Sequence, residues 1–364
     1  MSNTNNAILA MMQRGVPICI SGGSGVAKTS LIEAVAAQMG RWFHAFLPTH
    51  HLPEEVSGIP VVYREEEQVR MLSLDWMKRF QDPNGLFFID ELNTGSSTML
   101  ALLLSVIQER RIGNFRLSPD LLIAAALNPP EMAPNAIPLA ASVRNRFCWW
   151  DWRTPVHSFL QGIEADKFPT PETPVVRDAE LRDPIWGRLV RSFLESRPDY
   201  VEATTVNDEH RSFPTLRTWR MVKLGCAALD SIAADPEDYL TLTNGCVGDE
   251  ASSLFHQYVA TLDLYPARDV ILGNVPVDLN DDVDKLLHLP GALVFHARKM
   301  SEAGELLEEH IARCFELLLK LGENGLVDAV VKPMTIFVKF VHNWRPEPKL
   351  QARFGSLLNQ IRVS

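Results

Sequence analysis

A glycine-rich loop near the N-terminus has the residue types that bind a chain of phosphates. The pattern G-x-x-x-x-G-K-[ST] begins at Gly22 and ends at Lys28 and Thr29, with Ala27 in place of the last glycine. Glycines let successive backbone N–H groups converge on one anion, and a following helix adds the positive end of its dipole. We therefore expect ATP to bind here, at Gly22, Gly23, Ser24, Gly25, Val26, Ala27, Lys28, Thr29 and Ser30.

Within this loop the last three residues have separate expected tasks. Lys28 should reach the β- and γ-phosphates, and the Thr29 hydroxyl should be a ligand of Mg²⁺. The extra methyl group of Ala27 is tolerable if that residue is already helical. A glycine-rich turn with no function is the alternative. The apolar strand expected at 16–20 and the helical spacing of apolar residues after Thr29 argue against it.

Polar side chains follow two later apolar strands. Asp90 and Glu91 come after a strand expected at Leu86–Ile89, and Asn128 follows one expected at Leu121–Leu127. The carboxyl ends of parallel strands are where α/β folds bind ligands. Strand alternation points Asp90 and Glu91 differently, so Asp90 should hold Mg²⁺ and Glu91 should polarise the attacking water. Asn128 should bind the γ-phosphate or the water. An acidic strand end and an Asn-Pro turn are the structural alternatives.

Three arginines could supply positive charge to a phosphoryl-transfer transition state. Arg144 and Arg146 precede an apolar strand expected at Cys148–Trp152, and in a ring they could reach the site of the next subunit. Arg217 opens a helix after a linker and could reach the γ-phosphate from a second domain. A surface arginine is the alternative for each of them.

Strands alternating with helices in the N-terminal part predict an α/β fold with a parallel sheet covered on both faces. Two hairpins should interrupt the alternation, one within 58–77 with a charged tip at 64–67, and one within 111–117 with its turn near Gly113 and Asn114. Helical periodicity dominates later in the chain. The expected parts are a nucleotide-binding core at 1–165, a linker at 166–183, an α-helical lid at 184–268 and a C-terminal helical region at 269–364.

Composition narrows the class of protein. The chain has 364 residues, of which 46% are hydrophobic, which is enough for a sizeable core. Its net charge of -10 argues against nucleic acid as a partner. Five cysteines without C-x-x-C spacing predict buried free thiols in a reducing compartment. The polar N-terminus, and the absence of an apolar stretch of about 20 residues, predict a cytoplasmic protein with no membrane contact.

The order of these motifs resembles that of MoxR-type AAA+ ATPases, in the helix-2-insert clade. The resemblance rests on the phosphate loop, on the hairpin after Gly58, and on segments 88–93, 128–130, 145–147 and 213–217. It implies an AAA+ αβα core in which Lys28 and Thr29 are Walker A, and Asp90 and Glu91 are Walker B. It further implies sensor 1 at Asn128, a trans arginine finger at Arg146 with Arg144 as a possible second, and sensor 2 at Arg217. Leu216 stands where the family usually has proline.

The same resemblance implies a hexameric ring, a partner protein with a von Willebrand factor A domain, and a chaperone-like task of remodelling or activating a target. Two alternatives stay open. One is a P-loop kinase or small-molecule enzyme that acts alone, although the sequence reveals no substrate pocket for it. The other is a slow ATP-binding scaffold in a bacterial defence or conflict system. The charged hairpin tip is better explained as a solvated turn than as a substrate contact.

Overall fold

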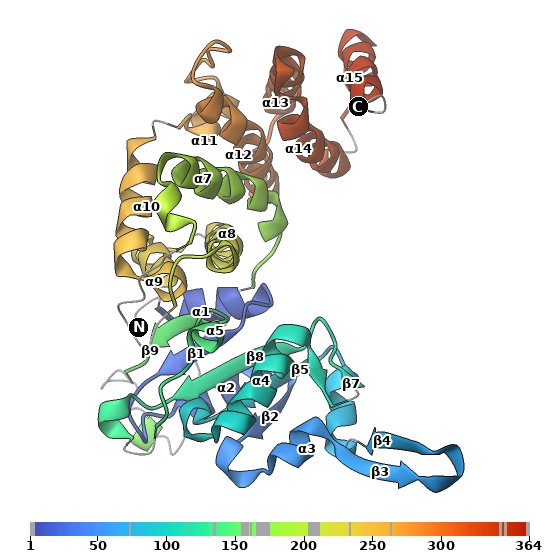
Figure 1. Ribbon diagram of the computed structural model, residues 1–364. Helices are drawn as coiled ribbons and strands as arrows, with labels where there is room; N and C mark the ends of the chain where they lie inside the picture. The colour runs from blue at the N-terminus through green and yellow to red at the C-terminus, as the bar shows by residue number, and fades with distance from the viewer. Residues whose placement is uncertain are drawn as a thin grey trace. The chain divides into compact units, whose positions relative to one another are not determined.

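A computed structural model describes residues 4–72, 74–113, 115–133, 136–153, 160, 162–164, 175–202, 212–232, 234–262, 264–341, 344–345 and 348–361. The chain divides into two compact units (Figure 1). The first comprises Met1–Val176 and Asp199–Ser253, and the second comprises Arg177–Pro198 and Leu254–Ser364.

The first unit contains a five-stranded sheet whose neighbouring strands all pair in parallel, in the order β2-β5-β8-β1-β9. The strands are β1 (Ile18–Ser21), β2 (Trp42–Phe46), β5 (Gly85–Ile89), β8 (Leu122–Leu127) and β9 (Cys148–Asp151). The prediction of an α/β fold with a parallel sheet is therefore confirmed. The sequence does not predict β2, because this edge strand is mostly half-buried and its residues form no continuous aliphatic run.

Helices lie on both faces of the sheet, which explains why its central strands are apolar throughout. On one face, Leu103 of α4 (Ser97–Glu109) shares a core with Phe87 and Ile123. The alternate residues of the strands point to the opposite face, where α2 (Lys28–Gln38) contacts β2, β5 and β8. This sandwich fixes the carboxyl ends of the strands, and the loops that follow them, at one edge of the sheet.

Both predicted hairpins are present. β3 (Ile59–Tyr63) pairs antiparallel with β4 (Gln68–Leu72), and Figure 1 shows this hairpin extending away from the sheet. The smaller hairpin joins β6 (Arg111–Ile112) to β7 (Phe115–Arg116). Its turn was predicted near Gly113 and Asn114, and Asn114 lies outside the described residues.

A largely helical region follows the last strand of the sheet, and further helices lie before and between its strands. In the first unit the other helices are α1 (Thr4–Gln13), α3 (Pro53–Ser57), α5 (Ala141–Arg144), α8 (Leu216–Ser231) and α9 (Pro236–Val247). The second unit contains α7 (Asp183–Ser196), α11 (Ala267–Leu272), α12 (Val283–Glu302), α13 (Glu308–Leu321), α14 (Val327–Phe340) and α15 (Pro348–Ile361). Helix α10 (Asp249–Thr261) has residues in both units.

The second unit has its own hydrophobic core. Leu293 of α12, Phe315 and Leu319 of α13, and Phe337 of α14 are buried in one cluster. These residues thus form the buried faces of the three helices. The predicted linker at 166–183 lies partly outside the described residues, and the predicted domain boundaries remain predictions.

The cysteines and the helices agree with two expectations from composition. All five cysteines are free and buried, as predicted. Burial raises the pKa of Cys314 to about 12, so this thiol stays protonated at neutral pH. Within the described part of the chain, we find no helix with the length and apolarity that a membrane crossing requires.

Asp238 gives the first unit a measurable pH dependence. This residue in the first turn of α9 is 2% exposed, and its Oδ2 has no hydrogen-bond partner among the described residues. Burial raises the pKa of Asp238 to about 6, compared with about 3.9 in an unfolded chain. Between these values the folded chain holds a proton that the unfolded chain has lost. The contribution of Asp238 to stability therefore decreases as pH rises from about 4 to about 6.

We expect Asp238→Asn to raise the free energy of unfolding at pH 7 by about 2 to 3 kcal/mol, because a shift of one pKa unit is worth about 1.4 kcal/mol. Below pH 4 the gain should vanish, since the carboxyl is then protonated in both states. Urea denaturation at both pH values measures this difference. Glu237→Gln, at the preceding residue of the same helix, is the control, and an equal gain from Asp238→Asn at both pH values would contradict the explanation.

Candidate nucleotide site

The glycine-rich loop connects β1 to α2 and is fixed by the end of β9. At Gly22 a Cβ atom would lie 2.7 Å from the carbonyl oxygen of Trp152, so the loop can pass this strand only without a side chain. The Trp152 indole N–H in turn donates to the Val26 carbonyl over 2.8 Å. Gly25 has φ +74°, a conformation that other residues adopt only with strain. The loop is therefore built in the curled form that a phosphate cradle requires.

Ala27 departs from the expected conformation. It has φ 60° and ψ 33°, which is left-handed, and it is the residue immediately before the first turn of α2. The condition under which the extra methyl group would be tolerated, a helical Ala27, is thus not met. The backbone adopts this left-handed conformation just before it enters the right-handed helix, and a glycine would adopt it without the steric penalty of a Cβ atom. Ala27 therefore adds local strain of about 1 to 2 kcal/mol to the loop.

We expect Ala27→Gly to raise the free energy of unfolding by about 1 kcal/mol, because it relieves this strain. The matched control is Ala34→Gly in α2, where a helical backbone should make the same replacement destabilising by about 1 kcal/mol. Urea denaturation of both variants compares them. A loss of stability in Ala27→Gly would rule out strain at this position.

Lys28 closes the loop onto the neighbouring strand. Its Nζ donates to the carbonyl oxygens of Gly22 and Gly23, each over 2.8 Å, and to Asn128 Oδ1 over 2.7 Å. Burial lowers the pKa of Lys28, and the negative charges of Asp90 and Glu91 oppose this decrease. The ammonium group thus lies at the centre of the site, where an anion could exchange with its neutral oxygen partners.

The two expected magnesium ligands are in direct contact. The Thr29 hydroxyl donates to Asp90 Oδ2 over 2.6 Å, which joins the start of α2 to the end of β5. The other oxygen, Asp90 Oδ1, accepts the backbone N–H of Glu91 over 3.0 Å. Both carboxylate oxygens are therefore oriented by the protein, as a metal ligand requires.

The expected strand alternation does not apply to Glu91, because its backbone has already left the strand. β5 ends at Ile89, and Glu91 adopts a left-handed conformation with φ 51° and ψ 44°. Its carbonyl oxygen accepts both the backbone N–H and the hydroxyl of Thr94, over 2.9 and 2.8 Å. The backbone of Glu91 is thus fixed, whereas its carboxylate makes no hydrogen bond that the structure records within the described residues. A carboxylate held in this way suits a general base.

Two asparagines link the end of β8 to the segment that follows β5. Asn128, at the end of β8, accepts the Lys28 ammonium through its side chain, and its backbone carbonyl accepts Asn93 Nδ2 over 2.9 Å. Asn93 is 3% exposed, and its Oδ1 is buried without a hydrogen-bond partner in the described part of the chain. Sequence reasoning gives Asn93 no role. Only its position three residues after Asp90 on the loop next to β8 could have indicated one.

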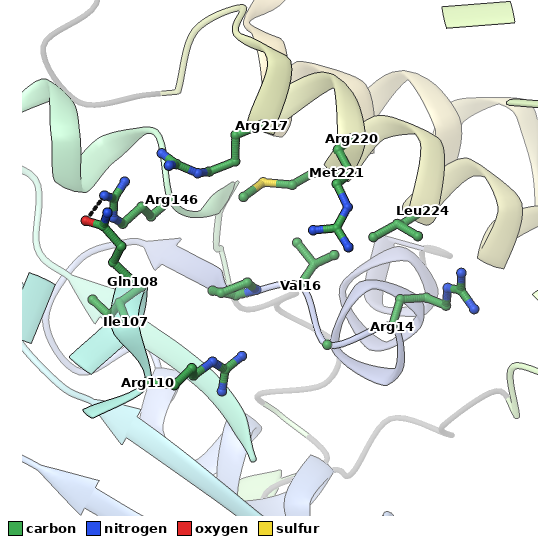
Figure 2. Close-up of a pocket in the computed structure, with 12 residues that line it drawn as sticks. Arg14, Val16, Ile107, Gln108, Arg110, Arg146, Arg217, Arg220, Met221 and Leu224 are labelled. Carbon is green, nitrogen blue, oxygen red and sulfur yellow. Dashed lines mark hydrogen bonds between the residues drawn. The ribbon is translucent and has the colours of Figure 1, made fainter. Parts of the chain in front are cut away.

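The predicted arginines fall into two places. Arg146 and Arg217 line one pocket of about 280 Å³, to which none of the residues from Gly22 to Ser30 contributes (Figure 2). Burial lowers the pKa of Arg146, and the positive charge of Arg217 adds to the decrease. Arg144 instead lies with its Cζ 5.7 Å from the Phe213 ring centre, outside this pocket. The structure therefore groups Arg146 with Arg217 in one pocket that neither Arg144 nor the loop lines.

Asn145 holds these segments together. Its Nδ2 donates to Thr215 Oγ1 over 2.7 Å, and its Oδ1 accepts the Ser212 hydroxyl over 2.9 Å. Thr215 is the N-cap of α8, the helix that carries Arg217. The sequence places Asn145 within an arginine motif without a task of its own. Its role depends on contacts across about 70 residues, which no local pattern shows.

Comparison with known proteins adds the following. No protein-family model and no curated protein matches the chain. Among solved structures, a "putative ATPase" from Cytophaga hutchinsonii is similar, with 16% sequence identity and a TM-score of 0.47. The match covers 71% of this chain and 88% of that one. At this level the likeness carries no argument about activity, which must be inferred from the residues of the site.

The residues present fit ATP with Mg²⁺. Lys28 and the loop amides are donors for phosphate oxygens, and Thr29 and Asp90 supply two hard oxygen ligands. In the described part of the chain, no three His, Cys, Asp or Glu side chains are arranged to hold a metal ion. Mg²⁺ normally combines one or two protein oxygens with phosphate oxygens and water, so the pair formed by Thr29 and Asp90 is sufficient.

Proposed function

We propose that this chain is a MoxR-type AAA+ ATPase that binds ATP with Mg²⁺ and hydrolyses it in a ring. The observation that carries the proposal is the contact between three strand ends. Lys28 reaches Asn128 over 2.7 Å, and Thr29 reaches Asp90 over 2.6 Å. Side chains separated by about 60 to 100 residues thus meet around one curled loop, in the combination that phosphoryl transfer needs.

Each residue then has a definite task in this proposal. The loop amides and Lys28 would bind the phosphates, and Thr29 and Asp90 would hold the metal. When bound, Mg²⁺ neutralises charge on the β- and γ-phosphate oxygens. Glu91 accepts a proton from the attacking water, and Asn128 orients that water or the γ-phosphate through its side-chain amide. The backbone of Glu91 is fixed by its bonds to Thr94, while its carboxylate makes no recorded hydrogen bond within the described residues, so its oxygens remain available to accept that proton.

The grouping of Arg146 with Arg217 supports completion of the site by a second copy of the chain. The pocket that the two arginines line has no lining residue from the loop at 22–30 of the same chain. Phosphoryl transfer nevertheless requires positive charge near the γ-phosphate, and an arginine supplied by a neighbour can provide it. In a closed ring, each subunit would give these arginines to the next one. A hexamer is the expected size from the family resemblance.

The same family resemblance suggests what the ring would act on. A partner with a von Willebrand factor A domain and a protein target that is remodelled or activated are the expected companions. Copurification with the ATP-bound Glu91→Gln variant tests this part of the proposal. The dependence of turnover on protein concentration distinguishes the ring from the two alternatives. Turnover per chain by a ring should rise steeply with protein concentration, whereas turnover by a slow scaffold or a stand-alone kinase should not.

Mixing experiments test the ring directly. We expect Arg146→Ala subunits, added to wild-type subunits at constant total concentration, to depress phosphate release below the value expected from simple dilution. A missing arginine finger typically costs about 10³-fold or more in turnover of the site that it serves. Phosphate release across a series of mixing ratios gives the curve.

Arg217→Ala serves as a second variant, because Arg217 is exposed and its loss should not disturb packing. Arg191→Ala is the control, since Arg191 is an exposed arginine of the second unit that pairs with Glu195. Turnover that follows the wild-type fraction linearly for both Arg146→Ala and Arg217→Ala would exclude arginines acting in trans.

A further inference from the structure

The pocket that holds Arg146 and Arg217 contains more positive charge than those two residues supply. Arg14, Arg110 and Arg220 also line it, and no acidic side chain lines it among the residues that the structure describes. Figure 2 shows Arg110, Arg146, Arg217 and Arg220 reaching the pocket from different sides, whereas the guanidinium of Arg14 extends away from Arg146 and Arg217. Such a concentration of cations is unexpected in a chain whose net charge is -10.

The donors of this pocket are only partly used. Arg146 is 7% exposed and bonds to the Ser142 carbonyl and to Gln108 Oε1, but its Nε is buried without a partner in the described part of the chain. Arg110 donates to the Leu121 carbonyl and lies near the negative charge of Asp120. A buried guanidinium nitrogen without an acceptor costs free energy that a bound anion would return.

The position of Arg217 and Arg220 on α8 adds an independent argument. Arg217 lies in the first turn of this helix and Arg220 lies three residues later, and the first turn contains no acidic residue. Cations are unfavourable near a helix N-terminus, where the dipole is positive. The fold therefore places Arg217 at the positive end of a helix and near the like charge of Arg146, with Arg220 in the second turn of that helix lining the same pocket. An anion between them would relieve both unfavourable interactions.

We propose that this pocket is a second anion site, which binds a short chain of phosphates through Arg110, Arg146, Arg217 and Arg220. Guanidinium groups bind phosphate oxygens in pairs, and several of them around one pocket favour more than one phosphate group over a single small anion. The volume of about 280 Å³ suits a ligand smaller than most drug-sized molecules. Arg220 and Arg110 thereby gain a role that the nucleotide site does not give them.

A phosphate chain can reach this pocket from two sources. One is a free oligophosphate, which requires nothing of the proposed function. The other is the triphosphate of ATP held by a second copy of the chain, and this source rests on the proposed function. Guanidinium groups would recognise the phosphates in the same way from either source. The same pocket variants can therefore be tested with a free oligophosphate and in mixed assemblies of the chain.

The test uses inorganic tripolyphosphate and the Lys28→Ala chain, in which the loop can no longer compete for phosphate. Calorimetry at low salt should find one site per chain, with an affinity that falls as ionic strength rises. A chain that carries both Lys28→Ala and Arg220→Gln should bind tripolyphosphate about tenfold or more weakly, because a charge-assisted hydrogen bond is lost. Lys223→Gln is the matched control. It removes one positive charge from the same helix at a residue that does not line the pocket.

The outcomes separate the sources from each other and from the proposed function. Binding by Lys28→Ala that Arg220→Gln weakens and Lys223→Gln does not weaken supports the site with a free ligand. If Lys28→Ala binds nothing, but Arg220→Gln subunits depress the turnover of wild-type neighbours and Lys223→Gln subunits do not, the phosphates belong to a neighbour's ATP. If neither effect is observed, the proposal is wrong. A chain that hydrolyses no ATP is judged by the calorimetry alone.

Discussion

Replacing Glu91 by glutamine should produce a chain that binds ATP and hydrolyses it at least about 100-fold more slowly. The amide cannot accept a proton from water, and loss of a general base typically costs 10² to 10⁴-fold in rate. Binding should persist because the phosphate contacts belong to Lys28 and the loop. The backbone of Glu91, which holds Asp90 Oδ1 through its N–H, is unchanged by the substitution.

Phosphate release under saturating Mg–ATP measures the rate, and calorimetry measures the affinity. Glu33→Gln is the matched control, because Glu33 is an exposed carboxylate on α2, next to the same loop. Its rate should equal that of the unaltered chain. Should Glu91→Gln hydrolyse ATP as fast as that chain, the water-activating carboxylate would have to be sought elsewhere.

Replacing Lys28 by alanine should weaken ATP binding by at least about 100-fold. Two lost charge-assisted hydrogen bonds, each worth roughly 1.5 to 3 kcal/mol, are enough for this effect. The same change removes the donor of Asn128 Oδ1 and the tie to Gly22 and Gly23. Part of the effect will therefore come from a loop that no longer holds its shape.

Calorimetric titration with ATP measures the affinity, and a thermal unfolding curve shows whether the variant is folded. Lys28→Met keeps the apolar stem of the side chain and separates loss of charge from loss of packing. Lys78→Ala, at an exposed residue paired with Asp75, is the control for removal of a lysine. Unchanged ATP affinity in a folded Lys28→Ala chain would be incompatible with a phosphate site at this loop.

The sequence predicts much of the central sheet and the residues that meet at its edge. The apolar runs before Asp90 and Asn128 predict the strands, and the polar residue after each run predicts where ligands bind. Both predictions come from adjacent residues, because ligands bind at the carboxyl ends of the strands. In the same way, the apolar strand before the loop and the helix after it indicate where Lys28 lies in the fold. These features are local, so a single segment of sequence carries each of them.

The features that the sequence does not predict depend on distant contacts. Asn145 bonds to Thr215, Asn93 bonds to the backbone of Asn128, and Trp152 supports Val26 across more than 100 residues. None of these contacts leaves a periodic pattern. The left-handed conformation of Ala27 is missed for another reason. Alanine is the strongest helix former, so its preference points to the conformation that the loop does not use.

Strand β9 has an unusual set of neighbours along the chain. Arg146 and Asn145 come just before it, and Trp152, which holds the phosphate loop at Val26, comes directly after it. The four residues of the strand span about 13 Å at about 3.3 Å per residue. They also pair in register with β1, which leads into the same loop.

Because β9 pairs with β1 along its whole length, we expect its two ends to move together. A shift of the loop that pulls on the Trp152 indole would be felt at Arg146, on the other side of the sheet edge. Under the proposed function, the strand would connect the loop that binds a subunit's own nucleotide to the arginine that the subunit would offer to the next one. Communication around a ring would then require no long-range rearrangement within a subunit.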